Sequence, residues 1–256
     1  MLLAVDVGNT QTVLGLYKTN ELLFKARIAT TSSDTADELL IKLQGLFMLH
    51  EFSCGEVSNV AIASVVPSLT EHWRKAALSL TTVEPLILTN ATDTGLTISF
   101  KNPSEIGADR LAVAVAGIHF YGTPVVIVDF GTATNIEVID TNGAFIGGII
   151  APGLLTSAEA LFSAAARLSK IDIEIPETVI GVTTKGAVQS GLTYGEIDRI
   201  DGLILRIFDE LGYQTPVVAT GGLSQRVVRL SKTITHINDD LTLEGLRLIF
   251  QRQFFD

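Results

Sequence analysis

Two short segments of related sequence carry side chains that suit phosphate binding. Asp6-Val-Gly-Asn-Thr-Gln-Thr12 aligns with Asp129-Phe-Gly-Thr-Ala-Thr-Asn135, and in each an aspartate ends an apolar strand with glycine two residues later. Glycine lets the backbone turn sharply and approach an oxyanion, while turn N–H groups and threonine or asparagine side chains donate to phosphate oxygens. A carboxylate at the strand end can also hold a hydrated Mg²⁺ ion.

The same residue types also suit an ordinary hairpin, because aspartate, glycine, asparagine and threonine all form turns. For a single copy we favour the hairpin. Two matching copies reverse that preference, together with the segment Thr220-Gly-Gly-Leu-Ser224, which follows the strand Val217–Ala219. Its glycines can lie against a nucleotide base and ribose, although a tight loop explains them equally well when they are taken alone.

Three other segments offer weaker candidates for chemistry. Gly107-Ala-Asp-Arg110 begins a predicted helix, where Asp109 can act as a general base and Arg110 can orient an anionic substrate. A helix-capping aspartate beside a surface arginine is the simpler explanation on spacing alone. The glycines of Gly147–Gly153 permit close backbone approach or form a structural turn, and Thr184 stands at a helix start, where most threonines are caps.

Other nucleotide-binding motifs are missing from the sequence. There is no G-x-x-x-x-G-K-[ST] segment, which disfavours a P-loop enzyme, and no G-x-G-x-x-G segment, which weakens a dinucleotide-binding interpretation. The single cysteine, Cys54, excludes an intrachain disulfide and a cysteine-based zinc site.

The elements that must position these residues follow a repeated order. The first part predicts three strands, a helix, a strand, a helix and a strand, with capping boxes at Thr35-x-x-Glu38 and Ser68-x-x-Glu71. The second part predicts the same order from Val125–Phe130 onward, including a hairpin around Thr141-Asn-Gly143. The other expected elements of both parts are Leu2–Val7, Thr12–Tyr17, Glu21–Ile28, Ser33–Leu49, Val60–Val65, Pro85–Leu88, Thr134–Ile139, Ala144–Ile150, Leu154–Ser169, Thr184–Leu211, Val217–Thr220 and Leu241–Gln253.

Two copies of an Asp-x-Gly turn, each leading such a unit, predict an α/β protein with a duplicated fold. No linker rich in proline, glycine or serine separates the halves, and we place the boundary within Glu105–Tyr121, with domains 1–112 and 113–256. The uncharged stretch Leu111–Val128 is long enough to span a membrane, but His119, Gly122 and Pro124 favour a helix, a turn and a buried strand instead.

Composition limits the classes of function. Of the 256 residues 47% are apolar, which is enough for a sizeable core, and the net charge is -10. Lysine and arginine form no basic stripe, so we expect neither a nucleic-acid nor a membrane partner. The start of the chain lacks the basic region of a signal peptide, and we expect a cytoplasmic protein.

The ordered set of motifs resembles the type III pantothenate kinase family, in the superfamily of acetate kinase, sugar kinases, heat-shock ATPases and actin. Each motif is weak alone, but they occur in the family's order over nearly the whole chain. The matching segments are Asp6-Val-Gly-Asn-Thr10, Pro103-Ser-Glu-Ile-Gly-Ala-Asp-Arg110, Asp129-Phe-Gly-Thr-Ala133, Gly147-Gly-Ile-Ile-Ala-Pro-Gly153, Thr184-Lys-Gly-Ala-Val-Gln-Ser-Gly191 and Thr220-Gly-Gly222.

The resemblance implies a fold and an activity. The fold is a pair of ribonuclease H-like (actin-like ATPase) domains, each a mixed five-stranded sheet with flanking helices, with a cleft between the lobes. The activity is transfer of the ATP γ-phosphate to the primary hydroxyl of pantothenate, the first step of coenzyme A biosynthesis. The family is homodimeric and uses Mg²⁺ and a monovalent cation, K⁺ or NH₄⁺.

Carried over by motif, the resemblance also implies a role for individual residues. Asp109 is the general base, Asp129 binds the monovalent cation, and Asp6 lies near Mg²⁺. Where many members have tyrosine ahead of the Gly-Ala-Asp-Arg stretch, this chain has Phe100, whose ring can pack on the substrate but has no hydroxyl to donate. The implied ATP contacts are Asp6, Val7, Gly8, Asn9, Thr10, Gln11, Thr12, Val13 and Thr132, and the implied pantothenate contacts are Phe100, Gly107, Ala108, Asp109, Arg110 and Thr184, the last of these acting across the dimer interface.

Two alternatives remain open from the sequence. One is an enzyme of the same superfamily that phosphorylates a different alcohol or a carboxylate. The other is a nucleotide-binding regulator without turnover, since proteins that closely resemble this family have been described as accessory transcription factors. Retention of both Asp-x-Gly turns and of Asp109 favours catalysis, and the absence of a basic patch disfavours direct DNA binding.

Overall fold

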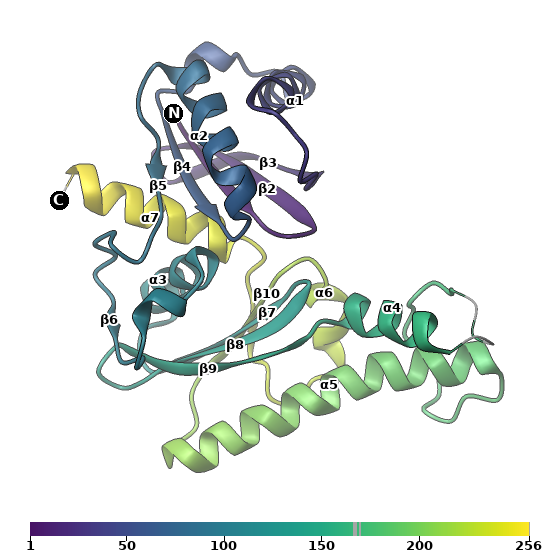
Figure 1. The fold of residues 1–256 in the computed structure, drawn as a ribbon. Helices are drawn as coiled ribbons and strands as arrows, with labels where there is room; N and C mark the ends of the chain where they lie inside the picture. The colour runs from purple at the N-terminus through teal and green to yellow at the C-terminus, as the bar shows by residue number, and fades with distance from the viewer. Residues whose placement is uncertain (166–167, 169, 256) are drawn as a thin grey trace. The chain divides into compact units, whose positions relative to one another are not determined.

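The computed structural model describes residues 1–165, 168 and 170–255, which form two compact units (Figure 1). The first unit contains Met1–His119 together with the terminal helix α7 (Leu241–Phe255), and the second contains Phe120–Asp240. This division places the boundary at residues 119 and 120, whereas we expected it at residues 112 and 113, and it also assigns α7 to the first unit. A side chain at Gly245 of α7 would collide with the backbone of Ala112, so that helix lies close against α3 (Ala108–Tyr121).

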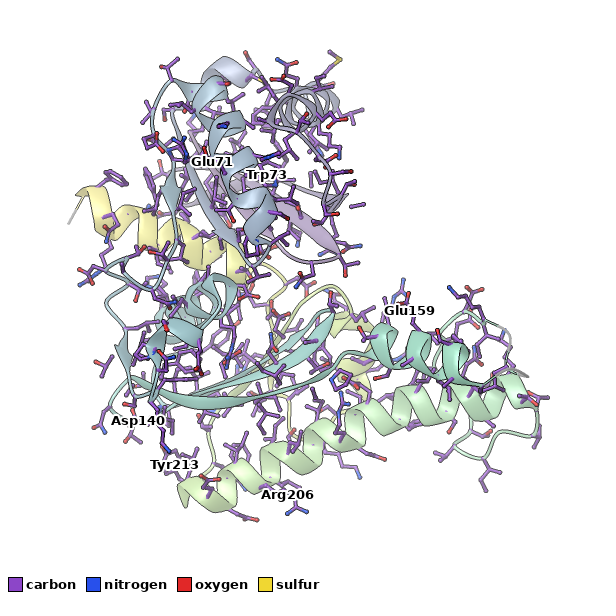
Figure 2. The ribbon with its side chains drawn as sticks, in the orientation of Figure 1. Glu71, Trp73, Asp140, Glu159, Arg206 and Tyr213 are labelled. Atoms are coloured by element: carbon purple, nitrogen blue, oxygen red, sulfur yellow. The ribbon has the colours of Figure 1, made fainter. Side chains whose placement is uncertain are left out.

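The first unit is built on a mixed five-stranded sheet with the order β3-β2-β1-β4-β5. β1 pairs antiparallel with β2 and parallel with β4, β2 pairs antiparallel with β3, and β4 pairs parallel with β5. One face packs on α1 and α2 through a core that includes Trp73 of α2, which is labelled in Figure 2. The elements are β1 (Leu2–Val7), β2 (Gln11–Lys18), β3 (Glu21–Ala29), α1 (Ala36–Leu49), β4 (Asn59–Ser64), α2 (Pro67–Thr81) and β5 (Leu86–Ile87).

The two predicted capping boxes have different outcomes. At α1, the Thr35 hydroxyl accepts from the Glu38 N–H at 3.3 Å and the Glu38 carboxylate accepts from the Thr35 N–H at 2.8 Å, which confirms the first. The second prediction is wrong, because α2 begins at Pro67 and its N-cap, Val66, makes no side-chain cap. Proline is preorganised for the first helical position, and it sets the helix start one residue before Ser68.

The second unit contains strands β7 to β11 in the order β11-β10-β7-β8-β9. The second sheet has six strands, of which these are five. The sheet thus has one strand more than the five that were predicted. Its core joins β7, β8 and β10 to the long helix α5. The elements are β7 (Val125–Phe130), β8 (Ala133–Ile139), β9 (Ala144–Pro152), α4 (Leu154–Ala164), α5 (Thr184–Leu211), β10 (Val217–Thr220), α6 (Ser224–Val227) and β11 (His236–Ile237), and the remaining short elements of the chain are β6 (Thr97–Ile98) and the 3₁₀ turns Cys54–Glu56, Pro103–Glu105 and Val228–Leu230.

Most of the second unit follows the sequence predictions. The β8–β9 turn is confirmed, with Asp140, labelled in Figure 2, accepting from Asn142 and Ala144, and Gly143 at φ +77°. α5 has the predicted bounds, whereas α4 ends at Ala164, and part of its predicted continuation to Ser169 falls outside the described residues. The stretch Leu111–Val128 forms most of α3, a turn and the first part of β7, in agreement with the expected helix, turn and strand. In the described part of the chain, no helix is long and apolar enough to cross a membrane.

The two sheets share one topology. β1-β2-β3 and β7-β8-β9 are antiparallel meanders, and β4 and β10 each pair parallel with the first strand of the meander in their sheet. β5 and β11 then extend the parallel side. This matching order confirms the predicted duplicated α/β fold and places an Asp-x-Gly hairpin at the corresponding edge of each sheet.

Candidate active site

The first Asp-x-Gly hairpin has a three-residue tip. β1 ends at Val7, β2 begins at Gln11, and the Gly8 N–H donates to the Gln11 carbonyl at 3.1 Å. A Cβ at Gly8 would lie 2.9 Å from that carbonyl oxygen, so the tight turn requires glycine. Asn9, Thr10 and Gln11 are exposed and can donate to an anion.

Thr12 differs from the rest of the predicted phosphate loop. Its side chain is buried, and its hydroxyl lies 2.9 Å from that of Thr30 on the segment after β3, while the Thr30 N–H donates to the Thr10 carbonyl. Thr12 therefore fastens the hairpin to the neighbouring strand. The exposed tip, rather than Thr12, is the part of this loop that is open to a ligand.

The neighbours of Asp6 in the sheet are apolar. Asp6 lies opposite Val13 on β2 and opposite Ala63 on β4. Residues directly opposite one another on adjacent strands share a face of the sheet. The two residues directly opposite Asp6 therefore have no side-chain oxygen.

The predicted base lies at the start of α3. The Asp109 carboxylate accepts from the Arg110 N–H at 2.8 Å, and it folds back over Gly107, where a Cβ would lie 2.5 Å from Oδ1. Burial raises the pKa of Asp109, and it outweighs the lowering effects of that hydrogen bond and of the Arg110 charge. A desolvated carboxylate with a raised pKa is a stronger proton acceptor than an exposed one.

Arg110 and Phe100, which were each expected to contact the substrate, lie beside one another. The Arg110 guanidinium lies 5.7 Å from the centre of the Phe100 ring, within the range of a cation–π contact. The ring thus packs against Arg110, which is the candidate residue for binding an anionic group of the substrate. This contact needs no tyrosine hydroxyl.

The second Asp-x-Gly hairpin is shorter by one residue. β7 ends at Phe130, β8 begins at Ala133, and the Gly131 N–H donates to the Ala133 carbonyl at 3.1 Å. Gly131 and Thr132 are exposed at the tip. The sequence alignment of the two turns therefore needs a one-residue gap, and the residue opposite Asp129 is Asn135, the counterpart of Val13 rather than of Thr12.

The start of α4 holds this second tip. The Gly153 N–H and the Thr156 hydroxyl both donate to the Thr132 carbonyl, at 3.0 and 2.6 Å. A side chain at Gly153 would collide with the Gly131 and Thr132 carbonyls. Gly153 is thus required by close packing against the loop, and Thr156 is a supporting residue that the sequence analysis missed.

A buried polar group on α5 also braces the hairpin. Glu196 accepts from the Thr134 hydroxyl at 2.7 Å and from Arg199 at 2.5 Å, and Arg199 donates to the Pro152 carbonyl at 2.8 Å. Glu196 and Thr134 are 5% and 1% exposed, so the pairing is largely shielded from water. The spacing of Glu196 and Arg199 is a sequence signal for an ion pair, but nothing local indicates a partner 62 residues away.

The polar neighbours of Asp129 distinguish it from Asp6. Asn135 lies opposite it on β8, and Thr220 lies opposite it on β10. Gly221, with φ +92°, packs so closely that a Cβ would collide with the Asp129 carboxylate and lie 2.6 Å from the Phe130 carbonyl oxygen. Gly221, which was predicted to face a nucleotide, is therefore required because a larger residue would collide with Asp129.

Thr184 lies elsewhere in the second unit. Thr183, not Thr184, caps α5, because its hydroxyl accepts from the Gly186 N–H at 3.0 Å, and the Thr184 side chain is exposed. Twelve residues separate Thr184 from Glu196, or roughly 18 Å along the helix. The structure thus does not bring Thr184 to the second hairpin of its own chain.

Comparisons with known proteins agree with this architecture. A family model described as type III pantothenate kinase matches residues 2–206. A relative from Thermomicrobium roseum, named "Type III pantothenate kinase", is 44% identical over 98% of this chain and 97% of its own, and one of the same name from Acidobacterium capsulatum is 43% identical over 99% and 95%. Among solved structures, a putative Baf family transcriptional activator from Campylobacter jejuni has a TM-score of 0.61 at 20% identity, covering 98% of both chains, and an ATP-glucomannokinase from Arthrobacter has 0.52 at 14% with the same coverage, which shows the shared fold.

Proposed function

The chain belongs to the type III pantothenate kinase family, and from this premise we propose how its residues carry out the reaction. The enzyme transfers the γ-phosphate of ATP to the primary hydroxyl of pantothenate and forms 4'-phosphopantothenate, the first step of coenzyme A biosynthesis. The observation that carries this proposal is family similarity over nearly the whole chain, combined with the buried carboxylate of Asp109 beside Arg110. Since ATP is the co-substrate, we place the reaction in the cytoplasm.

Asp109 is the proposed proton acceptor. Phosphoryl transfer depends mainly on positioning and charge neutralisation, with a carboxylate accepting the proton of the attacking hydroxyl. Gly107 and Ala108 provide backbone beside the base, while Arg110, supported by Phe100, binds the pantothenate carboxylate. Burial of Asp109 keeps its pKa above that of an exposed aspartate and makes it a better base.

The two hairpins divide the handling of charge. The first hairpin, from Gly8 to Gln11, holds the ATP phosphates. Asp6 at the end of β1 is placed to hold a hydrated Mg²⁺, which usually takes one or two carboxylates together with water and phosphate oxygens. When bound, Mg²⁺ neutralises charge on the phosphates. Thr132 contributes to ATP binding from the second hairpin, where Asp129 binds K⁺ or NH₄⁺.

A second copy of the chain is the proposed partner. The second unit exposes large apolar side chains around α4 and the start of α5, which lie side by side in Figure 1. Val182 is 94% and Ile180 81% exposed. Single exposed apolar side chains are common, but a group of them marks an interaction surface. A homodimer that covers this surface would let Thr184 reach pantothenate bound to the partner subunit. The apolar residues are Ile150, Leu155, Val179, Ile180 and Val182.

An acceptor panel tests the proposed activity. ADP release would be measured with ATP, Mg²⁺ and K⁺, and with pantothenate, a hexose or N-acetylmannosamine as acceptor. We expect pantothenate-dependent ADP release and a product one phosphate heavier by mass spectrometry. Turnover with a sugar alone would indicate another kinase of the superfamily, and ATP binding without turnover on any acceptor would favour a regulator.

A further inference from the structure

We propose that the amide oxygen of Asn135 is a second protein ligand of the monovalent cation at Asp129. The inference rests on the proposed function, since the family resemblance is what places a cation at Asp129. Asn135 was not among the residues that the resemblance assigned to the site, and it is identified here by strand register and burial.

The register places the two side chains together. Asp129 and Asn135 are directly opposite in the antiparallel pair β7–β8, so both side chains stand on one face of the sheet. Such pairs have Cβ atoms about 4.5–5.5 Å apart. A carboxylate and an amide at this separation can both reach one cation.

The amide oxygen lacks a hydrogen-bond donor. Asn135 Oδ1 is buried, and no described residue donates to it. A buried polar atom that is left unpaired is unfavourable and calls for a partner, such as an ordered water or an ion. Carbonyl-type oxygens are the ligands that replace the hydration shell of K⁺, so this oxygen fits the proposed ion.

The other neighbour of Asp129 adds to the fit. Thr220 lies opposite Asp129 on β10, and its buried side chain stands on the same face of the sheet. The central carboxylate is therefore flanked by an amide on one side and a hydroxyl on the other. All three are oxygen donors of the kind that hard cations prefer.

The first sheet provides an internal control. There the residues opposite the aspartate are Val13 and Ala63, which have no side-chain oxygen. The positions directly opposite Asp6 thus offer an ion no side-chain ligand, which suits Mg²⁺, an ion that usually keeps several waters. At Asp129, protein oxygens can replace water, which suits a larger and more weakly hydrated monovalent ion. Asn135 thus distinguishes the surroundings of Asp129 from those of Asp6.

The test is a thermal-unfolding titration with KCl at constant ionic strength, balanced by NaCl and carried out without substrates. In wild type we expect the melting temperature to rise with K⁺. In Asn135→Val the K⁺ midpoint should rise at least tenfold, while in NaCl alone the variant should melt at or above the wild-type temperature, because an unpaired oxygen has been removed. The two proteins should therefore exchange order of stability as K⁺ is added.

Two further variants control the result. Asn135→Thr keeps an oxygen and should recover part of the K⁺ response. Asn59→Val replaces a strand asparagine of the first sheet, at the end of β1 away from Asp6, and should keep the wild-type midpoint. A wild-type K⁺ midpoint in Asn135→Val would overturn the inference. If K⁺ affects neither stability nor turnover of wild type, the cation assignment at Asp129 fails instead, and the inference fails with it.

Discussion

The two Asp-x-Gly hairpins have the same backbone plan but different surroundings. Each follows the central strand of a five-strand pattern, and each closes with an N–H of the glycine bonded to the following strand. Asp6 stands between Val13 and Ala63, whereas Asp129 stands between Asn135 and Thr220. Residues on the neighbouring strands thus give the two copies of the loop different polar surroundings, although the Asp-x-Gly motif is the same in both.

The support of the two hairpins differs as well. The first is tied to β3 by a pair of threonine hydroxyls, Thr12 and Thr30. The second is held by Gly153, Thr156 and the buried Glu196, which come from two helices and their junctions. This difference is consistent with the proposed ions, because direct protein ligands need a fixed arrangement, whereas a hydrated Mg²⁺ tolerates more movement of its loop.

The largest expected effect tests whether either hairpin aspartate is the base. Asp109→Asn should lower kcat by about 10²–10⁴-fold, because Asp109, which lies outside both hairpins, is the proposed proton acceptor. Burial raises the folded-state pKa of Asp109 above the unfolded value of about 3.9. Wild type therefore loses stability as the pH rises from the unfolded pKa to the folded pKa. The variant should therefore melt at the same or a higher temperature at pH 8. Near-normal turnover would move the base to another residue, a hairpin aspartate included.

The next effect concerns the packing of the second hairpin. Gly221→Ala adds a Cβ that collides with the Asp129 carboxylate, in a backbone conformation that side chains rarely adopt. We expect the K⁺ midpoint of the thermal-unfolding titration to rise at least about tenfold, and the free energy of unfolding to fall by about 1–3 kcal/mol. Gly202→Ala is the matched control, since a Cβ there meets nothing within 4 Å and the site is inside α5. An unchanged K⁺ titration in Gly221→Ala would mean that Asp129 does not need this packing.

The third effect concerns stability rather than turnover or cation binding, and it should be confined to the second unit. The buried Asp201 on α5 accepts from the backbone N–H groups of Lys232 and Thr233 and from the hydroxyls of Ser231 and Thr233. Burial raises the pKa of Asp201, but these hydrogen bonds outweigh it and leave the pKa below its usual value. The stabilisation is present above the unfolded pKa and is lost as pH falls through the folded value.

Asp201→Asn should therefore cost about 1.5–3 kcal/mol at pH 7, with the difference from wild type shrinking below about pH 4. Hydrogen exchange should show faster opening in α5 and in the segment at residues 231–233, with β1 and β2 unchanged. Equal loss of protection in both sheets would show that the units do not open separately.

The sequence could predict what local patterns determine. The repeated aspartate and glycine indicated the duplication, the Thr35 and Glu38 pair marked the start of α1, and Gly143 marked the β8–β9 turn. The partner of Asp129 could not be predicted in this way, because it depends on a one-residue difference in loop length that shifts the register. The contact of Glu196 with Thr134 and the close approach of Gly221 to Asp129 likewise arise only when distant segments pack together.

The measurement that tests the division of labour most directly is a crossed cation titration of turnover in Asp6→Asn and Asp129→Asn. We expect Asp6→Asn to raise the Mg²⁺ midpoint and leave the K⁺ midpoint unchanged, and Asp129→Asn to do the reverse. The reason is that the residues directly opposite Asp129 carry side-chain oxygens, whereas those directly opposite Asp6 do not. Equal shifts of both midpoints in both variants would contradict the account and show that the two hairpins bind their ions in the same way.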